Sequence, residues 1–182
     1  MLFFEIFIPI LFFLFLWVFF SPRAIKISVA YAPFLPTPKN AIRRALREIN
    51  LKPNEKFYDL GSGTGRSLII ASREFGAKVT GFEYVTSFFI FSKINLFLRG
   101  IKDANVYRKD FFSFNLRDAD VIFMFLTPKA FNKLEDKLKQ ELKPNTRIVT
   151  FSSPLLFWKP EKVTYLSKKH KNLKLHFYIK KS

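Results

Sequence analysis

The chain has 182 residues, enough for one ordinary domain of about 150 residues with a short appendage, so a two-domain enzyme is not expected. Hydrophobic residues make up 49% of the chain and supply a packed core, whereas the absence of cysteine and the presence of two separated histidines exclude disulfides and argue against a metal. The formal charge of +17 would attract anionic lipid, nucleic acid or acidic protein, but the basic residues are scattered and we interpret them as a solvated surface.

The first twenty residues are apolar apart from Glu5, and a helix of that length spans about 30 Å of hydrocarbon. A cleaved signal peptide would need a basic leader and small residues at its end, and neither is present. Arg23 and Lys26 follow the run and no basic residue precedes it, which favours a cytoplasmic domain. We predict a single-pass transmembrane anchor over 1–22, a juxtamembrane linker over 23–36 and the lipid bilayer as a partner; a buried core helix is the alternative.

Beyond the linker, helix and strand signals alternate. Thr37 is placed to cap a helix in which Pro38 takes the first position, and apolar residues then recur on one face as far as Ile49. Further helices are predicted over 66–75, 86–99 and 128–142, and strands over 56–60, 78–83, 104–109, 119–125 and 146–151. The segments 161–167 and 173–180 alternate polar and apolar residues, as in an antiparallel hairpin. We predict an α/β domain over 37–182, with a mostly parallel twisted sheet, helices on both faces and a C-terminal hairpin.

A glycine-rich turn follows the first predicted strand. Gly61, Gly63 and Gly65 are spaced as G-x-G-x-G, whereas a dinucleotide-binding turn would require glycine at the position of Arg66. Asp59 precedes the turn by two residues and can neutralise an ammonium group. S-adenosylmethionine carries such an ammonium and has no pyrophosphate, so the pattern favours this cofactor over NAD.

Acidic residues also end the next two predicted strands. Glu83 is placed to accept hydrogen bonds from both ribose hydroxyls, and Asp110 to reach the adenine amino group. Each acid alone is explained as well by helix capping or solvent exposure, and Phe111 by a core position, but three acids at successive strand ends favour a site. The expected cofactor-binding residues are Thr37, Asp59, Gly61, Ser62, Gly63, Gly65, Glu83, Asp110 and Phe111.

These residues resemble the class I methyltransferases that include the archaeal broad-specificity protein lysine methyltransferases and the animal mitochondrial enzyme that acts on the ATP synthase c-ring lysine. The likeness covers roughly residues 32–160. It rests on Phe34-Leu35-Pro36-Thr37-Pro38, the 58–66 stretch, Glu83, Asp110-Phe111-Phe112, Phe125-Leu126-Thr127 and the segment Glu141 to Val149. It implies a Rossmann-like class I methyltransferase fold and transfer of a methyl group from S-adenosylmethionine to a lysine of a protein. The predicted anchor would favour acceptors that lie in or beside the bilayer, so a membrane protein is a possible substrate.

One position departs from the family. After Val149, relatives commonly continue with Ser-His, whereas this chain has Thr150-Phe151, so the polar side chain of the family is missing. The implied reaction needs a neutral lysine amine, which an apolar pocket favours by lowering the lysine pKa. No general base is assigned. The candidate pocket residues are Tyr31, Phe34, Phe125, Leu126 and Thr127.

Three alternatives stay open. Methylation of RNA would fit the basic surface, but the Asn or Asp followed by Pro-Pro and an aromatic residue is absent at 125–128, so nucleic acid is not the expected partner. A lipid or small hydrophobic acceptor would fit the apolar helix 86–99 and the segment 155–158. The third alternative is a membrane-bound protein that binds S-adenosylmethionine without turnover, with Phe151 as the symptom.

Overall fold

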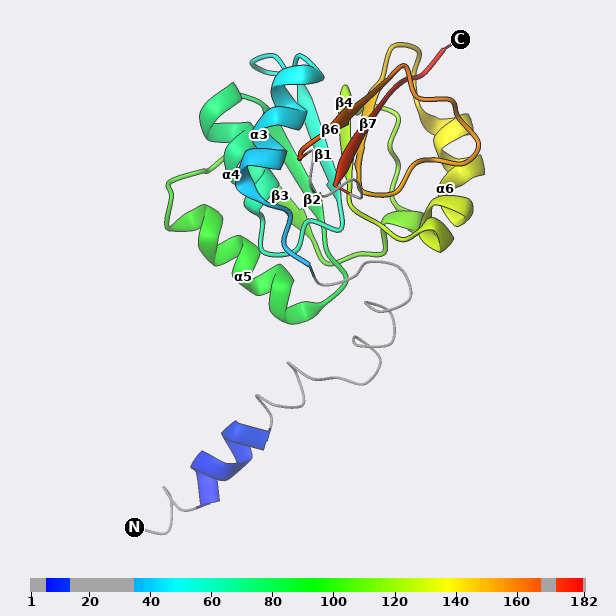
Figure 1. Cartoon of the computed structure of the whole chain (residues 1–182). Coiled ribbons are helices and arrows are strands. Elements are labelled where there is room, and N and C mark those ends of the chain that lie inside the picture. The colour runs from blue at the N-terminus through cyan, green and yellow to red at the C-terminus, as the bar shows by residue number, and fades with distance from the viewer. Residues whose placement is uncertain (1–5, 14–34, 168–172, 182) are drawn as a thin grey trace.

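The computed structural model describes residues 6–13, 35–167 and 173–181 (Figure 1). Its centre is a seven-stranded sheet of order β3-β2-β1-β4-β5-β7-β6. The strands are β1 (Lys56–Leu60), β2 (Lys78–Phe82), β3 (Ala104–Tyr107), β4 (Val121–Met124), β5 (Arg147–Phe151), β6 (Lys162–Tyr165) and β7 (Lys174–Ile179). The first five strands pair in parallel with one another, and β7 pairs antiparallel with both β5 and β6. The predicted parallel sheet with a terminal hairpin is therefore present.

Helices cover both faces of the sheet (Figure 1). They are α3 (Lys39–Glu48), α4 (Arg66–Phe75), α5 (Thr86–Phe97) and α6 (Pro128–Glu141), with a short 3-10 helix η1 (Phe111–Ser113). Because successive strand residues point to opposite faces, Phe57 of β1 packs into the cluster with α3 and α4, and Tyr58 packs into the cluster with α6. The alternation of strand and helix signals in the sequence reflects this three-layer arrangement.

The start of α3 differs by one residue from the prediction. Pro38 occupies the cap position with an extended backbone, the helix begins at Lys39, and no side chain caps it. Thr37 instead contributes its backbone carbonyl, which accepts a hydrogen bond of 3.1 Å from Nη1 of Arg66 at the start of α4. The two helices are thereby joined beside the carboxyl edge of the sheet.

The segment at the start of β5 has a structural role at the opposite edge of the sheet. Nη1 of Arg147 donates to the carbonyl oxygens of Ile49 and Asn50 at 2.9 and 2.7 Å, and Nη2 lies 2.5 Å from Oε1 of Glu55. The Thr146 hydroxyl donates to the Ala119 carbonyl. These bonds fasten the end of α3 to the amino ends of the strands, which gives a physical reason for the motif on which the resemblance partly rests.

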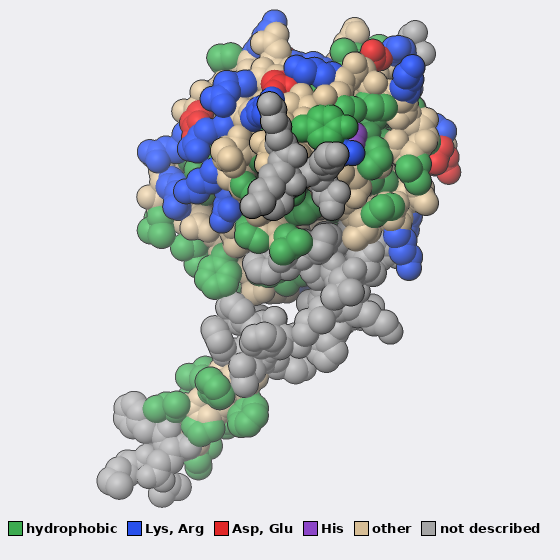
Figure 2. All heavy atoms as spheres, in the orientation of Figure 1, with side chains coloured by type: hydrophobic (Ala, Val, Ile, Leu, Met, Phe, Trp, Pro, Cys, Tyr) green, Lys and Arg blue, Asp and Glu red, His purple; other side chains and the backbone are tan. Residues whose placement is uncertain are grey.

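The surface carries two features anticipated from composition. Lys and Arg side chains are spread over many elements without forming one block (Figure 2). The outer face of α5 exposes large apolar side chains, and these are Ile90, Phe91, Ile94, Phe97 and Leu98. Burial in the core therefore accounts for only part of the apolar character of this helix.

The prediction of a membrane-spanning helix over 1–22 is wrong. Of that region the structure describes residues 6–13, which are helical. Across the whole described part of the chain, no helix combines the length and the apolar character that a membrane span requires. The predicted localisation, a single-pass membrane protein with its domain on the cytoplasmic side, depended on that helix and is therefore also wrong. The domain limits at 37–182 and the linker over 23–36 stay predictions.

Candidate active site

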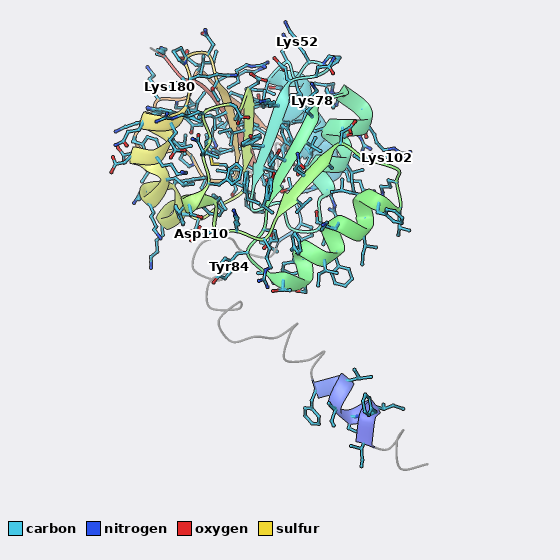
Figure 3. All side chains as sticks on the ribbon, turned by 180° about the vertical axis from the view of Figure 1, so that it is seen from behind. Lys52, Lys78, Tyr84, Lys102, Asp110 and Lys180 are labelled. Atoms are coloured by element: carbon cyan, nitrogen blue, oxygen red, sulfur yellow. The ribbon has the colours of Figure 1, made fainter. Side chains whose placement is uncertain are left out.

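A cavity of about 430 Å³ lies at the carboxyl ends of β1, β2 and β4. Successive strands extend the sheet in opposite directions from β1, and such a switch point is where open α/β folds bind ligands. Tyr84 and Asp110 lie at this edge of the sheet, whereas Lys52 and Lys78 lie toward the other edge (Figure 3).

We divide the residues that line this cavity into two groups. The group that we call the β2 end consists of Gly63, Glu83, Tyr84, Val85, Phe88, Asp110, Phe111, Phe112 and Lys133. The group that we call the α3 end consists of Leu35, Pro36, Thr37, Ile42, Phe123 and Phe125. Asp59 and Ser67 also line the cavity.

Backbone hydrogen bonds hold the glycine turn against β2. The N–H groups of Gly61 and Ser62 both donate to the carbonyl of Phe82, at 2.9 and 3.0 Å. Gly65 has a φ of +79°, and a methyl group placed on it would lie 2.5 Å from the hydroxyl oxygen of Ser92 on α5. Glycine is therefore required at position 65, both for the backbone conformation and for the close approach of α5.

Glu83 ties the turn to the end of β2. Its Oε2 accepts a hydrogen bond of 2.8 Å from the N–H of Gly63, and its Oε1 accepts one of 2.8 Å from the N–H of Val85. Burial raises the pKa of Glu83, although these two N–H groups oppose the rise. Each carboxylate oxygen has a second lone pair, so the side chain can still accept hydrogen bonds from a ligand in the cavity.

Asp59 is buried at the end of β1, with an exposed fraction of 4%. The Ser67 hydroxyl in the first turn of α4 donates to its Oδ2. Burial raises the pKa of Asp59 to about 7, and the nearby Glu83 carboxylate contributes to the rise. A carboxyl group with this pKa gains its negative charge readily when a cation binds beside it.

Asp110 and the aromatic residues after it form the far wall of the β2 end. The Asp110 side chain caps η1 by accepting a hydrogen bond of 3.0 Å from the N–H of Phe112. The ring centroids of Phe111 and Phe112 lie 4.6 Å apart, and Nζ of Lys133 on α6 lies 4.1 Å from the Phe112 centroid. Both the capping role and the site role weighed for Asp110 are thus compatible with its position.

Comparison with known proteins decides what this arrangement belongs to. The model of the ANTKMT methyltransferase domain matches residues 59–162, a segment that begins at Asp59 and includes the glycine turn, Glu83 and Asp110. The chain belongs to the ANTKMT methyltransferase family. The resemblance to protein lysine methyltransferases is confirmed, and so are the enzyme class and the cofactor, S-adenosylmethionine.

Relatives of this ANTKMT-family chain include archaeal and animal enzymes. A protein-lysine N-methyltransferase of Saccharolobus islandicus is 30% identical over 83% of this chain and 95% of the relative. The adenine nucleotide translocase lysine N-methyltransferase of Mus musculus is 30% identical, over 70% of this chain and 56% of the relative. Among solved structures, an RNA methyltransferase from Salinibacter ruber in complex with S-adenosyl-L-homocysteine has a TM-score of 0.75 and 27% identity, covering 80% of this chain and 93% of that one.

The residues of the family member fit the cofactor in size and chemistry. A methyl group added to Gly63 would meet nothing within 4 Å, so the backbone there faces open space. The cavity volume of about 430 Å³ lies in the range of small-molecule sites. The buried carboxyl groups of Asp59, near the end of β1, and Glu83, after β2, suit the ammonium group and the ribose hydroxyls of the cofactor.

Most of the predicted site residues come together in the cavity of this methyltransferase. Those that line it are Thr37, Asp59, Gly61, Ser62, Gly63, Glu83, Asp110, Phe111 and Phe125. Gly65 acts behind the turn, and the Ser62 hydroxyl is buried with no hydrogen-bond partner among the described residues. Their roles toward the cofactor stay predictions.

Two residues of the predicted acceptor pocket lie elsewhere. Leu126 is packed in the core beneath α6, because the strand alternation turns it away from the cavity. Thr127 is the N-cap of α6, where its hydroxyl accepts from the N–H of Ala130. Tyr31 and Phe34 lie outside the described residues.

Sequence reasoning missed several cavity residues. Tyr84 directly follows Glu83, and Ser67 is the second residue of α4, two residues after Gly65, so proximity to the motifs was a usable signal for both. Ile42 and Lys133 come from helices that are distant in sequence, and no local pattern marks them. Arg66 was noted only as a non-glycine position, yet it lines the cavity and joins α4 to Thr37.

Proposed function

We propose that this chain methylates lysine side chains of proteins, with S-adenosylmethionine as the methyl donor. The observation that carries the proposal is the α3 end of the cavity, where Ile42, Phe123 and Phe125 form an apolar wall close to Asp59. A lysine side chain is a narrow apolar stem with a terminal amine, which suits such a wall. The likeness to the archaeal protein-lysine N-methyltransferase, over almost the whole of that protein, supports the same substrate class.

We assign the β2 end to the cofactor. Asp59 would pair with the methionine ammonium, Glu83 would accept hydrogen bonds from the ribose hydroxyls, and Asp110 with Phe111 would hold the adenine. The glycine turn supplies backbone that a ligand can approach closely. When bound, S-adenosylmethionine provides an electrophilic methyl group on sulfur.

The chain's own contribution to catalysis is orientation and exclusion of water. An apolar α3 end disfavours a charged ammonium and so lowers the pKa of an incoming lysine, which must be neutral to attack. Holding the amine in line with the methyl group converts a bimolecular encounter into an effectively unimolecular one. No side chain is assigned as a general base, and the proton leaves to water.

The test uses the full chain with tritium-labelled S-adenosylmethionine and a cell extract as acceptor. Label should persist after nuclease and solvent extraction, be released by protease, and appear in methyl-lysine by mass spectrometry. Glu83→Ala serves as the binding-deficient control and should abolish the label. Label confined to nuclease-sensitive material would overturn the proposal, and cofactor binding without any transfer would identify a protein that has lost turnover.

RNA is the second candidate acceptor. The favouring observations are the likeness to the Salinibacter ruber RNA methyltransferase and the net charge of +17. Against it, the residues that follow β4 are Phe125-Leu126-Thr127-Pro128, and Phe125 offers a flipped base no hydrogen-bond partner. The nuclease arm of the same experiment separates the two acceptors.

A further inference from the structure

Phe125 and Phe151 form an aromatic pair at the α3 end of the cavity. Met124 and Thr150 are paired in the parallel β4–β5 register, so Phe125, directly after β4, comes beside Phe151, the last residue of β5. The ring centroids of Phe125 and Phe151 are 4.8 Å apart, with an interplanar angle of 70°. Phe125 lines the cavity, whereas Phe151 is 2% exposed and packs into the core behind it.

This packing leaves the Phe125 ring little freedom. Phe151 belongs to the cluster formed by β5, β7 and α3, and protein cores are packed to the density of organic crystals. While Phe151 is in place, the Phe125 ring therefore cannot move away from the cavity toward the core. An edge-to-face pair also favours one relative orientation of the two rings.

We infer that Phe151 is a positioning residue that holds Phe125 as a fixed wall beside the accepting nitrogen and thereby limits how many methyl groups that nitrogen receives. The inference rests on the proposed lysine methylation, and it gives a role to the residue that replaces the family histidine. Phe151 contacts neither cofactor nor acceptor in this scheme and acts through Phe125.

The chemistry explains why a fixed wall beside the accepting nitrogen limits the number of methyl groups transferred. In each transfer the nitrogen lone pair forms the new N–C bond, the C–S bond breaks, and its electron pair stays on sulfur as S-adenosylhomocysteine. The alkylated ammonium then loses a proton to water before it can attack again. Each added methyl enlarges the nitrogen, so the second and third transfers need space that the first does not.

The first test compares Phe151→Leu with a matched control, Phe177→Leu. Phe177 lies on β7 in the same core cluster and does not line the cavity. Phe151→Leu should let the Phe125 ring retreat and raise the ratio of di- and trimethyl-lysine to monomethyl-lysine about fivefold, the scale of a partial change in an apolar pocket. Phe177→Leu should keep the wild-type ratio. An unchanged ratio in Phe151→Leu, or the same change in both variants, would overturn the inference.

A second test needs no acceptor. S-adenosylethionine carries an ethyl group where S-adenosylmethionine carries a methyl, so the ratio of their dissociation constants measures the space beside the wall. The dissociation constant of S-adenosylethionine divided by that of S-adenosylmethionine should fall about fivefold in Phe151→Leu and also fall in the milder Phe151→Met. The same ratio should stay constant in Phe177→Leu. Equal ratios in all four proteins would reject the wall. A wild type that makes no methyl-lysine would defeat the proposed function, while the binding ratio would still decide the role of Phe151.

Discussion

The two ends of the cavity are built by different forces. At the β2 end, carboxylates and backbone N–H groups form a hydrogen-bonded frame in which Glu83 joins Gly63 to Val85. At the α3 end, the wall consists of apolar side chains, and Phe125 is held by ring packing against Phe151. The β2 end therefore depends on the direction of hydrogen bonds and on charge, whereas the α3 end depends on the volume of its apolar side chains.

This difference explains what each end can tolerate. A hydrogen-bonded frame fails when one partner is lost, because the remaining buried polar groups are left unsatisfied. A packed wall tolerates exchange of one apolar residue for another and changes the shape of the site. Substitutions at the β2 end should therefore abolish binding, whereas those at the α3 end should alter which product forms.

The largest effect is expected from Gly65→Ala. The φ of +79° and the 2.5 Å approach to the Ser92 hydroxyl together should lower the free energy of unfolding by about 3 kcal/mol and remove cofactor binding. Gly100→Ala is the matched control, since Gly100 has a φ of +66° but no atom within 4 Å of an added methyl, and it should cost about 1 kcal/mol. Urea denaturation measures the free energy of unfolding of both variants. Equal losses of stability would show that the close approach of α5 to Gly65 does not add to the cost of the substitution.

Glu83→Ala tests the frame itself. Loss of the carboxylate removes the acceptor of the Gly63 and Val85 N–H groups, so affinity for S-adenosylmethionine should fall about 100-fold by calorimetry. Glu74→Ala removes an exposed acid that pairs with Arg43 on the helix surface and should leave affinity unchanged. Wild-type affinity in Glu83→Ala would remove this residue from the site.

The pH dependence of Asp59 gives a smaller effect. Burial raises its folded-state pKa from 3.8 to about 7, so the native protein retains a proton that the unfolded chain loses between these values. The stability that this proton provides is complete below the unfolded value and is lost as the pH rises through about 7.

A bound ammonium favours the ionised form of Asp59, so affinity for S-adenosylmethionine should rise with pH up to the folded pKa, by at most about tenfold per pH unit. Calorimetry at several pH values measures this rise. Asp59→Asn, which keeps an acceptor for Ser67, should show weaker binding and a flat profile between about pH 5 and 8. A wild-type profile equally flat would contradict the pairing with an ammonium.

Arg66→Ala should have the smallest effect. Its bond to the Thr37 carbonyl joins α4 to the segment before α3, and losing it should weaken cofactor binding only about threefold because the residue is partly exposed. Arg73→Ala, in the last turn of the same helix, is the control and should be neutral. A loss as large as that of Glu83→Ala would mean that Arg66 contacts the ligand directly.

The β2 end was the more predictable of the two. Asp59 lies near the end of β1, Glu83 directly follows β2, and Asp110 comes three residues after β3. Parallel strands bring their carboxyl ends to one edge, so sequence position alone implied proximity. Leu126 and Thr127 were misplaced because a single residue of strand alternation decides whether a side chain faces the cavity or the core. The membrane-spanning helix was predicted from hydropathy alone, and among the described residues no helix has both the length and the apolar character that a span requires.

By itself the sequence determined the order of elements, the glycine turn and the family, because these depend on local periodicity and on residues close together in the chain. Only the tertiary structure decided that Ile42 and Lys133 line the cavity and that Phe151 lies behind Phe125. Those relations join segments separated by tens of residues, and they are set by strand register and by packing of the core, which no local pattern encodes.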